Sequence, residues 1–227
     1  FLNWMVKDNF TFLGYREYRI KAVEGDHKIE GVNEGAMGLM RRSVSRDLML
    51  SELPAQARKQ ALNSSLLILT KTNNKSRVHR PAYIDYVGIK RFDDKGHVIG
   101  EDRFIGLYSS SLYNNSAADI PLLKNKLAKV MAKSGFAPGT HAYKALLNIL
   151  ETYPRDELIQ ATSDELLDVS TGVLQMQERD MTRLFMRKDA FGRFVSAMVY
   201  VPRERYNTQL RKDTQQILAQ SLGSTEA

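Results

Sequence analysis

The fold is decided by the stretch RPAYIDYVGIKRFDDKGHVIGEDRFIGLYSSSLY, residues 80–113. Its apolar and aromatic residues predict two long strands, one on each side of a turn at residues 93–96. The turn sequence Asp-Asp-Lys-Gly suits a type I turn that is closed by a glycine with positive φ. Because a long apolar hairpin is not stable alone in water, we expect it to form the centre of a sheet.

The segments before this hairpin predict further strands and one helix. We expect strands at residues 10–20, 27–32 and 65–71, and a helix at residues 51–63 that is capped by Ser51. Gly14 lies inside the first strand and indicates a bulge or a close backbone approach. Strand, helix and further strands in this order predict an α+β fold with an antiparallel sheet.

After residue 118 the apolar residues follow a helical period. We predict three consecutive helices there, at residues 119–134, 140–153 and 162–174. The first carries a single apolar stripe, made of Leu123, Leu127, Val130 and Met131. Thr162 and Glu165 fit a capping box at the start of the third. These helices are expected to connect two modules or to pack as a layer against the sheet.

From residue 182 the pattern of strands returns. Residues 183–187 and 193–201 predict a second hairpin, whose turn has the same chemistry as the first. A helix that is capped by Asn207 or Thr208 follows it. A two-stranded hairpin with one helix is too small to be stable alone, so we expect it to open a larger α/β module.

The composition excludes several classes of site and partner. The chain has 227 residues, a formal net charge of +7 and no cysteine, which excludes disulfides, thiolate metal sites and cysteine nucleophiles. Basic residues are spread along the chain beside acidic ones, and no nucleic-acid-binding motif accompanies them. We therefore predict no nucleic-acid partner.

Neither a membrane span nor a targeting segment is recognisable. No apolar run approaches the roughly 20 residues that cross a bilayer. Residues 1–5, FLNWM, lack the basic region and the cleavage site of a signal peptide. Together with the absence of cysteine, this predicts a cytoplasmic protein without a membrane partner. Both ends look cut, so we expect an excised piece of a longer chain.

No catalytic or metal-binding constellation is recognisable either. The four histidines lie far apart in the sequence, so none is predicted to be a metal ligand. The chain contains neither G-x-S-x-G nor any G-x-G, which argues against a nucleophile elbow and against a nicotinamide-binding fingerprint in this segment. We predict no catalytic, cofactor-binding or metal-binding residue.

The titratable residue that stands out is Asp85, because apolar strands rarely carry an unpaired acid. It lies five residues after Arg80, at the entrance to the first hairpin. Two interpretations stay open at this point. Asp85 forms an ion pair or a backbone cap at the strand end, or Arg80 and Asp85 contact a ligand. Both residues are therefore our candidate ligand-binding residues.

Several long motifs occur in an order that resembles the amino-terminal half of the large bacterial NAD-specific glutamate dehydrogenases. They are FTFLGYREY (10–18), VHRPAYIDYVGIKRF (78–92), ALLNILETYPRDEL (145–158), RLFMRKDAFGRF (183–194) and VPRERYN (201–207). The resemblance covers nearly the whole chain, and residues 21–63 are its variable part.

The resemblance implies a modular arrangement. In that family a very large subunit carries ACT-like modules, a PAS-like module, helical motifs and a catalytic dehydrogenase domain toward its carboxyl end. Here it implies a PAS-like sheet domain at residues 1–118, a helical connector at 119–181 and a partial ACT-like module at 182–227. The family's nicotinamide and glutamate sites have no matching positions, so no catalytic residue is carried over, and NAD is expected to be the cofactor of the parent enzyme.

The preferred hypothesis is a non-catalytic regulatory or architectural segment of an enzyme that oxidatively deaminates glutamate to 2-oxoglutarate with NAD. Its expected partners are the remainder of the parent chain, the homo-oligomer of that chain and an amino-acid effector. The alternative is an autonomous small-molecule sensor, in which the first hairpin walls a pocket for an amino acid.

Overall fold

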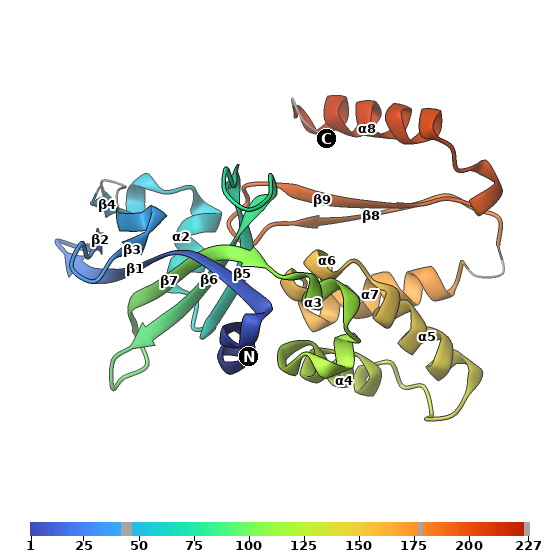
Figure 1. Ribbon diagram of the computed structural model, residues 1–227, viewed down its shortest axis with the longest axis horizontal. Helices are drawn as coiled ribbons and strands as arrows, with labels where there is room; N and C mark the ends of the chain where they lie inside the picture. The colour runs from blue at the N-terminus through green and yellow to red at the C-terminus, as the bar shows by residue number, and fades with distance from the viewer. Residues whose placement is uncertain (42–46, 177–178, 225–227) are drawn as a thin grey trace.

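An antiparallel sheet occupies one end of the molecule and a layer of helices the other, while a second hairpin lies along both (Figure 1). The computed structural model describes residues 1–41, 47–176 and 179–224. Residues 225–227, the last of the predicted ACT-like module, lie outside this range. The predicted α+β fold with an antiparallel sheet is confirmed.

The main sheet is built around the hairpin that the sequence singles out. Within the described residues its strands are β1 (Phe10–Val23), β2 (Asp26–Gly31), β3 (Met37–Gly38), β4 (Leu48–Met49), β5 (Leu67–Lys75), β6 (Tyr83–Phe92) and β7 (Val98–Tyr108). Their order is β4-β2-β1-β7-β6-β5, with β3 beside β1, and every pairing is antiparallel. Because β7 lies between β1 and β6, the hairpin is central, as predicted.

Gly14 is the site of both a β-bulge and a close approach to a neighbouring residue, the two alternatives that its position in the strand indicates. The register between β1 and β7 shifts between Phe12 and Gly14, which is a bulge. A Cβ atom at Gly14 would lie 2.9 Å from Cγ of Met40, so a side chain does not fit there without movement. The bulge and the close approach of Met40 occur at the same residue.

The helix predicted at residues 51–63 begins later than expected. Helix α2 is Ala55–Leu62, and Ser51 lies in a separate 3₁₀ turn, Leu50–Glu52, so the prediction that Ser51 caps the helix is wrong. Leu53 precedes Pro54 and has the extended ψ of 149°. A proline disfavours the helical conformation of the residue before it, which prevents the helix from beginning at Ser51.

Four helices form the second layer. They are α4 (Pro121–Lys133), α5 (His141–Thr152), α6 (Arg155–Gln160) and α7 (Ser163–Leu174). The predicted apolar stripe of the first is buried, and Thr162 and Glu165 form the predicted capping box. Helix α6 was not predicted, because Pro154 interrupts the helical pattern only two residues after α5 ends.

A lysine from a neighbouring helix holds the end of α6. Nζ of Lys126 donates to the carbonyl oxygens of Leu158, Ile159 and Ala161 at 2.9, 2.7 and 2.7 Å. Carbonyls at the end of a helix have no partner within the helix, and this ammonium supplies one. Burial, with a smaller contribution from Arg187, lowers the pKa of Lys126 to about 8.

The sheet and the helical layer share one hydrophobic core. It joins Val87 and Tyr108 of the sheet to Leu123, Leu146 and Leu158 of the helices. Burial of apolar side chains is the main favourable contribution to folding, so these two layers stabilise each other. Short helical segments complete this part, namely α1 (Leu2–Trp4), α3 (Ser110–Asn114) and turns at Met5–Asn9, Leu39–Arg41 and Ala117–Asp119.

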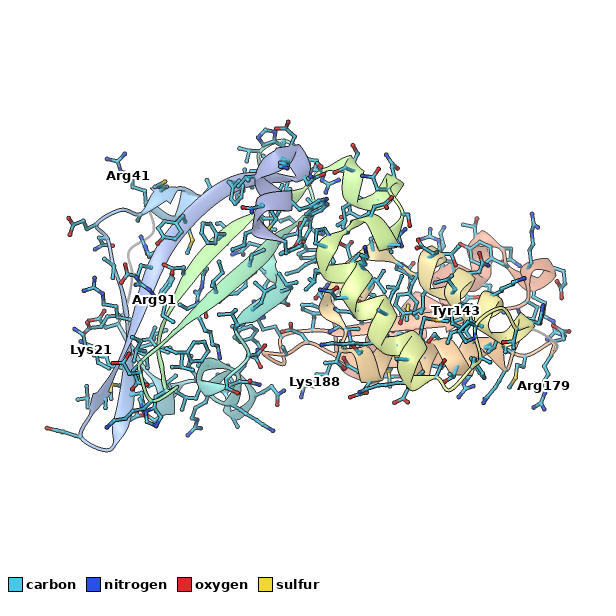
Figure 2. All side chains as sticks on the ribbon, turned by 90° about the horizontal axis from the view of Figure 1, so that it is seen from below. Lys21, Arg41, Arg91, Tyr143, Arg179 and Lys188 are labelled. Carbon is cyan, nitrogen blue, oxygen red and sulfur yellow. The ribbon has the colours of Figure 1, made fainter. Side chains whose placement is uncertain are left out.

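The second hairpin pairs β8 (Arg183–Lys188) with β9 (Val195–Tyr200), and α8 (Thr208–Leu222) follows a 3₁₀ turn at Arg203–Arg205. Of the two predicted caps, Asn207 is the one used, because its side chain accepts the N–H of Leu210 at 2.8 Å. In Figure 2, Arg179 lies at the far end of the helical layer and Lys188 lies nearer the sheet. The hairpin therefore runs from one layer toward the other.

Candidate functional site

Asp85 is buried on β6 and has two partners. Only 2% of the residue is exposed. Its Oδ1 lies 2.6 Å from Nζ of Lys71 on the neighbouring strand β5, and its Oδ2 accepts the backbone N–H of Tyr108 at 3.1 Å. Of the interpretations left open by the sequence, Asp85 thus makes both an ion pair and a backbone cap, and its ion-pair partner is Lys71.

Arg80 lies in the loop before β6 and reaches the same strand end. Its Nη2 donates to the carbonyl oxygen of Tyr108 at 2.8 Å, and its guanidinium lies over the ring of Tyr113, 5.6 Å from the ring centre. Arg80 and Asp85 are therefore brought together through the backbone of Tyr108. Their role as ligand contacts stays a prediction.

Asp156 closes these contacts into a ring. Its Oδ1 lies 3.1 Å from Nζ of Lys71 and accepts the hydroxyl of Tyr113 at 3.1 Å. Asp156 belongs to α6, so the ring joins the sheet to the helical layer. We call this ring the junction network, and it consists of Lys71, Arg80, Asp85, Tyr108, Tyr113 and Asp156.

The charged groups of the junction network shift one another's pKa values. Burial lowers the pKa of Lys71, but the carboxylates of Asp85 and Asp156 outweigh it, and the net shift of that pKa is upward. Burial raises the pKa of Asp85, while Lys71 and the N–H of Tyr108 oppose that rise. The net shift of the Asp85 pKa is upward, so Lys71 and the N–H of Tyr108 offset only part of the cost of burying this carboxylate.

The tip of the second hairpin makes its own polar contact with the sheet. Asp189 is 1% exposed, and its Oδ1 accepts the hydroxyl of Thr70 on β5 at 2.5 Å. Its Oδ2 accepts from Nε of Arg193 at 3.0 Å. The ring of Phe191 meets the ring of Tyr86 edge-on, with 5.9 Å between ring centres. These five residues form what we call the tip contact.

The hairpin is also tied to α6. Nε and Nη2 of Arg187 donate to the two carboxylate oxygens of Glu157 at 2.8 and 2.9 Å. Such a two-point pair fixes orientation as well as distance. Glu157 follows Asp156 directly in the sequence, so α6 binds the sheet through one carboxylate and the hairpin through the next.

Sequence reasoning found Arg80 and Asp85 but missed their partners. Lys71 and Asp85 are directly opposite each other in the β5–β6 register, so a correct strand alignment would have paired them. No comparable signal marks Asp156 or the contact of Asp189 with Thr70, because those partners come from elements far away in the sequence. Among the described residues, no group of three or more His, Asp or Glu side chains is placed to hold a metal ion. No helix of the described chain is long and apolar enough to cross a bilayer.

Two family models match parts of the chain. Residues 120–179 match the one described as "Glutamate dehydrogenase, helical motif 1". Residues 183–227 match "Glutamate dehydrogenase, ACT2 domain". The helical layer and the second hairpin with α8 are thus similar to consecutive modules of glutamate dehydrogenases.

Curated relatives point to a particular kind of glutamate dehydrogenase. The chain is 40% identical to the NAD-specific glutamate dehydrogenase of Halomonas elongata over 99% of its own length, 42% identical to that of Pseudomonas aeruginosa over 100%, and 29% identical to that of Mycobacterium tuberculosis over 99%. It spans only 13–14% of the length of these relatives. The resemblance to one segment of NAD-specific glutamate dehydrogenases is confirmed. No solved structure matches the chain.

Proposed function

We propose that this chain is a non-catalytic, architectural and regulatory segment of a large NAD-dependent glutamate dehydrogenase. The parent reaction is the oxidative deamination of glutamate to 2-oxoglutarate, and the cofactor NAD binds outside this segment. Its partners are the remainder of the parent chain and the homo-oligomer of that chain. Essentially the whole chain is similar to a short part of each much longer relative, and this supports the proposal.

The observation that carries the architectural role is the position of α6. This helix of six residues holds the sheet through Asp156 and the hairpin through Glu157. Because the two carboxylates are adjacent, a rotation of α6 moves both contacts together. The segment is therefore built to keep three modules in one relative orientation, which is what a spacer or relay in a multi-module subunit requires.

We propose further that residues 1–118 form a PAS-like domain. The five long strands lie in the order β2-β1-β7-β6-β5, and the helix α2 lies between the second and third of them in the sequence. This order, in which the first two strands lie beside the last, agrees with a PAS-like arrangement. An experimental structure with another strand order would contradict it.

Two measurements test the proposed function. Incubating the chain with glutamate and NAD should yield no NADH absorbance at 340 nm, and turnover by the pure chain would overturn the non-catalytic role. In the second, Glu157→Gln should speed amide hydrogen exchange in β8 and β9, because the pair with Arg187 is lost. Glu204→Gln is the matched control, since Glu204 is exposed and has no ion-pair partner within the described residues. Equal exchange in both variants would contradict the role of α6.

The alternative of an autonomous amino-acid sensor is not favoured. The similarity extends over essentially all of this chain and places it within much longer relatives, all named as enzymes. We therefore do not propose an independent sensing protein.

A further inference from the structure

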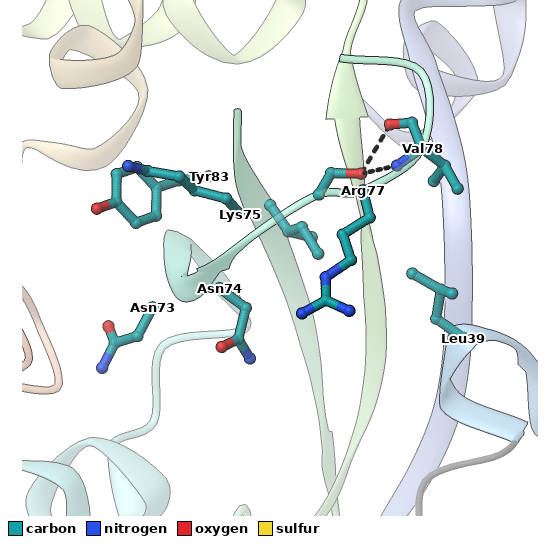
Figure 3. Close-up of a pocket in the computed structure, with 9 residues that line it drawn as sticks. Leu39, Asn73, Asn74, Lys75, Arg77, Val78 and Tyr83 are labelled. Atoms are coloured by element: carbon teal, nitrogen blue, oxygen red, sulfur yellow. Dashed lines mark hydrogen bonds between the residues drawn. The ribbon is translucent and has the colours of Figure 1, made fainter. Parts of the chain in front are cut away.

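The end of β5 and the loop after it line an open surface pocket of about 550 Å³ (Figure 3). Its lining consists of Leu39, Asn73, Asn74, Lys75, Ser76, Arg77, Val78, Tyr83 and Ile84. This lining contains two side-chain amides, one guanidinium and one ammonium, and it contains no carboxylate. Its chemistry therefore favours an anionic occupant.

Arg77 is the distinctive group of this pocket. In Figure 3 its guanidinium points down from the loop, between the side chains of Asn74 and Leu39. It makes no hydrogen bond or ion pair within the described part of the chain, whereas Arg80, Arg187 and Arg193 each hold a carbonyl or a carboxylate. Arg91 lines a separate, more apolar hollow between β1, β3, β6 and β7, and it is likewise already paired, with Glu17 at 2.7 Å. The five N–H donors of Arg77 are available for a ligand.

The loop that carries Arg77 has a fixed shape without a ligand. Ser76 is 3% exposed, and its hydroxyl donates to the carbonyl of Val78 at 2.8 Å and accepts the N–H of Val78 at 3.2 Å. The N–H of Ser76 donates to the carbonyl of Ala82 at 2.8 Å, across the base of the loop. Because these hydrogen bonds hold the backbone, binding here orders side chains and not the loop itself.

We propose that this pocket binds a small multivalent oxyanion, of the phosphate or polycarboxylate class. The planar fork of Arg77 matches two oxygens of such an anion. Asn73 and Asn74 supply further N–H donors, and Lys75, whose Nζ lies 5.0 Å from the ring centre of Tyr83, adds positive charge at the rim. The site lies three residues before Arg80, so it adjoins the loop that enters the junction network.

The inference does not depend on the proposed function, because the 227-residue chain can be tested alone. The probes are inorganic phosphate and citrate, at constant ionic strength set with sodium chloride. At about ten times Kd a ligand shifts the folding equilibrium about 11-fold. For a chain of this length, that shift raises Tm by roughly 3–6 °C. A rise in Tm that saturates with the concentration of phosphate, of citrate or of both supports the site. Comparing the two anions then shows which one the site prefers.

Variants separate a specific site from the general stabilisation that phosphate gives to proteins. Arg77→Ala should abolish the saturable part of the shift, and Arg77→Lys should retain only part of it, since a lysine keeps the charge without the fork. Arg58→Ala is the matched control, because Arg58 is exposed on α2. Chemical-shift changes of the amides of residues 73–78 provide a readout at the site itself. Equal shifts in the wild-type chain and Arg77→Ala, or no saturable shift with either anion, would overturn the proposal.

Discussion

Arg80 and Asp85 both hydrogen-bond to the backbone of Tyr108, one at its carbonyl and the other at its N–H, and make no direct contact with each other. Arg80 donates to the carbonyl of Tyr108, and Asp85 accepts its N–H, at 2.8 and 3.1 Å. Tyr108 is the last residue of the central strand β7 and is itself buried. The two residues predicted as ligand contacts therefore hold the end of the sheet, at the point where the chain turns toward the helices.

The junction network predicts the effect of Asp85→Asn. This change leaves Lys71 with only Asp156 as an acidic partner and removes a buried charge that the ammonium requires. Breaking a buried pair by removing one partner typically costs about 3–5 kcal/mol. Because Lys71 keeps Asp156, we expect a loss of about 2 kcal/mol in the free energy of unfolding by urea. Asp94→Asn, in the exposed turn, should change it by less than about 0.5 kcal/mol. Equal losses in both variants would contradict the network.

The tip contact predicts a dependence of stability on acid. Burial raises the pKa of Asp189, but Arg193 and Thr70 outweigh it, and the net pKa lies below the ordinary value of 3.8. A carboxyl with a lowered folded-state pKa stabilises the fold above its unfolded pKa, and that stabilisation is lost as the pH falls through the folded pKa. Between pH 5 and pH 3 the Tm of the wild-type chain should therefore fall more than that of Asp189→Asn. Parallel curves for the two proteins would show that Asp189 makes no such contribution.

At the alkaline end the informative residue is Tyr15, whose hydroxyl donates to Asp102 at 2.8 Å. Burial, followed by Asp102, raises its pKa to about 12. A raised folded-state pKa gives stability that is complete below the unfolded value of about 10 and is lost as the pH rises toward 12. Tyr15→Phe should remove one late step from the phenolate absorbance at 295 nm. Loss of an early step in Tyr15→Phe would be the contrary result.

Gly106 of β7 predicts the steric tolerance of the central strand. A Cβ atom there would lie 2.2 Å from the carbonyl oxygen of Thr11 and 2.3 Å from the ring of Phe10. Neither neighbour can move freely, since one is backbone and the other is a buried core side chain. We expect Gly106→Ala to lower the free energy of unfolding by about 3 kcal/mol. Gly25→Ala, with open space around the added carbon, should cost only about 1 kcal/mol for its positive φ. Urea unfolding of both variants checks the difference, and similar values would argue against the close packing of β1 on β7.

The local structure of this protein follows from local sequence signals wherever these are strong. The turn with Gly96 at a φ of 81°, the capping box at Thr162 and the apolar stripe of α4 all depend on residues within a few positions of one another. The helix at Ala55 began later than predicted for an equally local reason, the restriction that Pro54 places on Leu53. The candidate residue Asp85 was recognised because a carboxyl in an apolar strand must have a partner.

The two hairpin turns separate what the sequence determined from what only the tertiary structure decided. Both Asp93 and Asp189 accept the N–H groups two and four residues further along, and in both turns a glycine with positive φ follows at the third position. This shared turn chemistry was predictable. Asp93 faces solvent, whereas Asp189 is buried against Thr70, 119 residues earlier in the chain. That difference depends on which surface the hairpin meets, and packing between distant elements sets it, because local turn geometry is the same in both places.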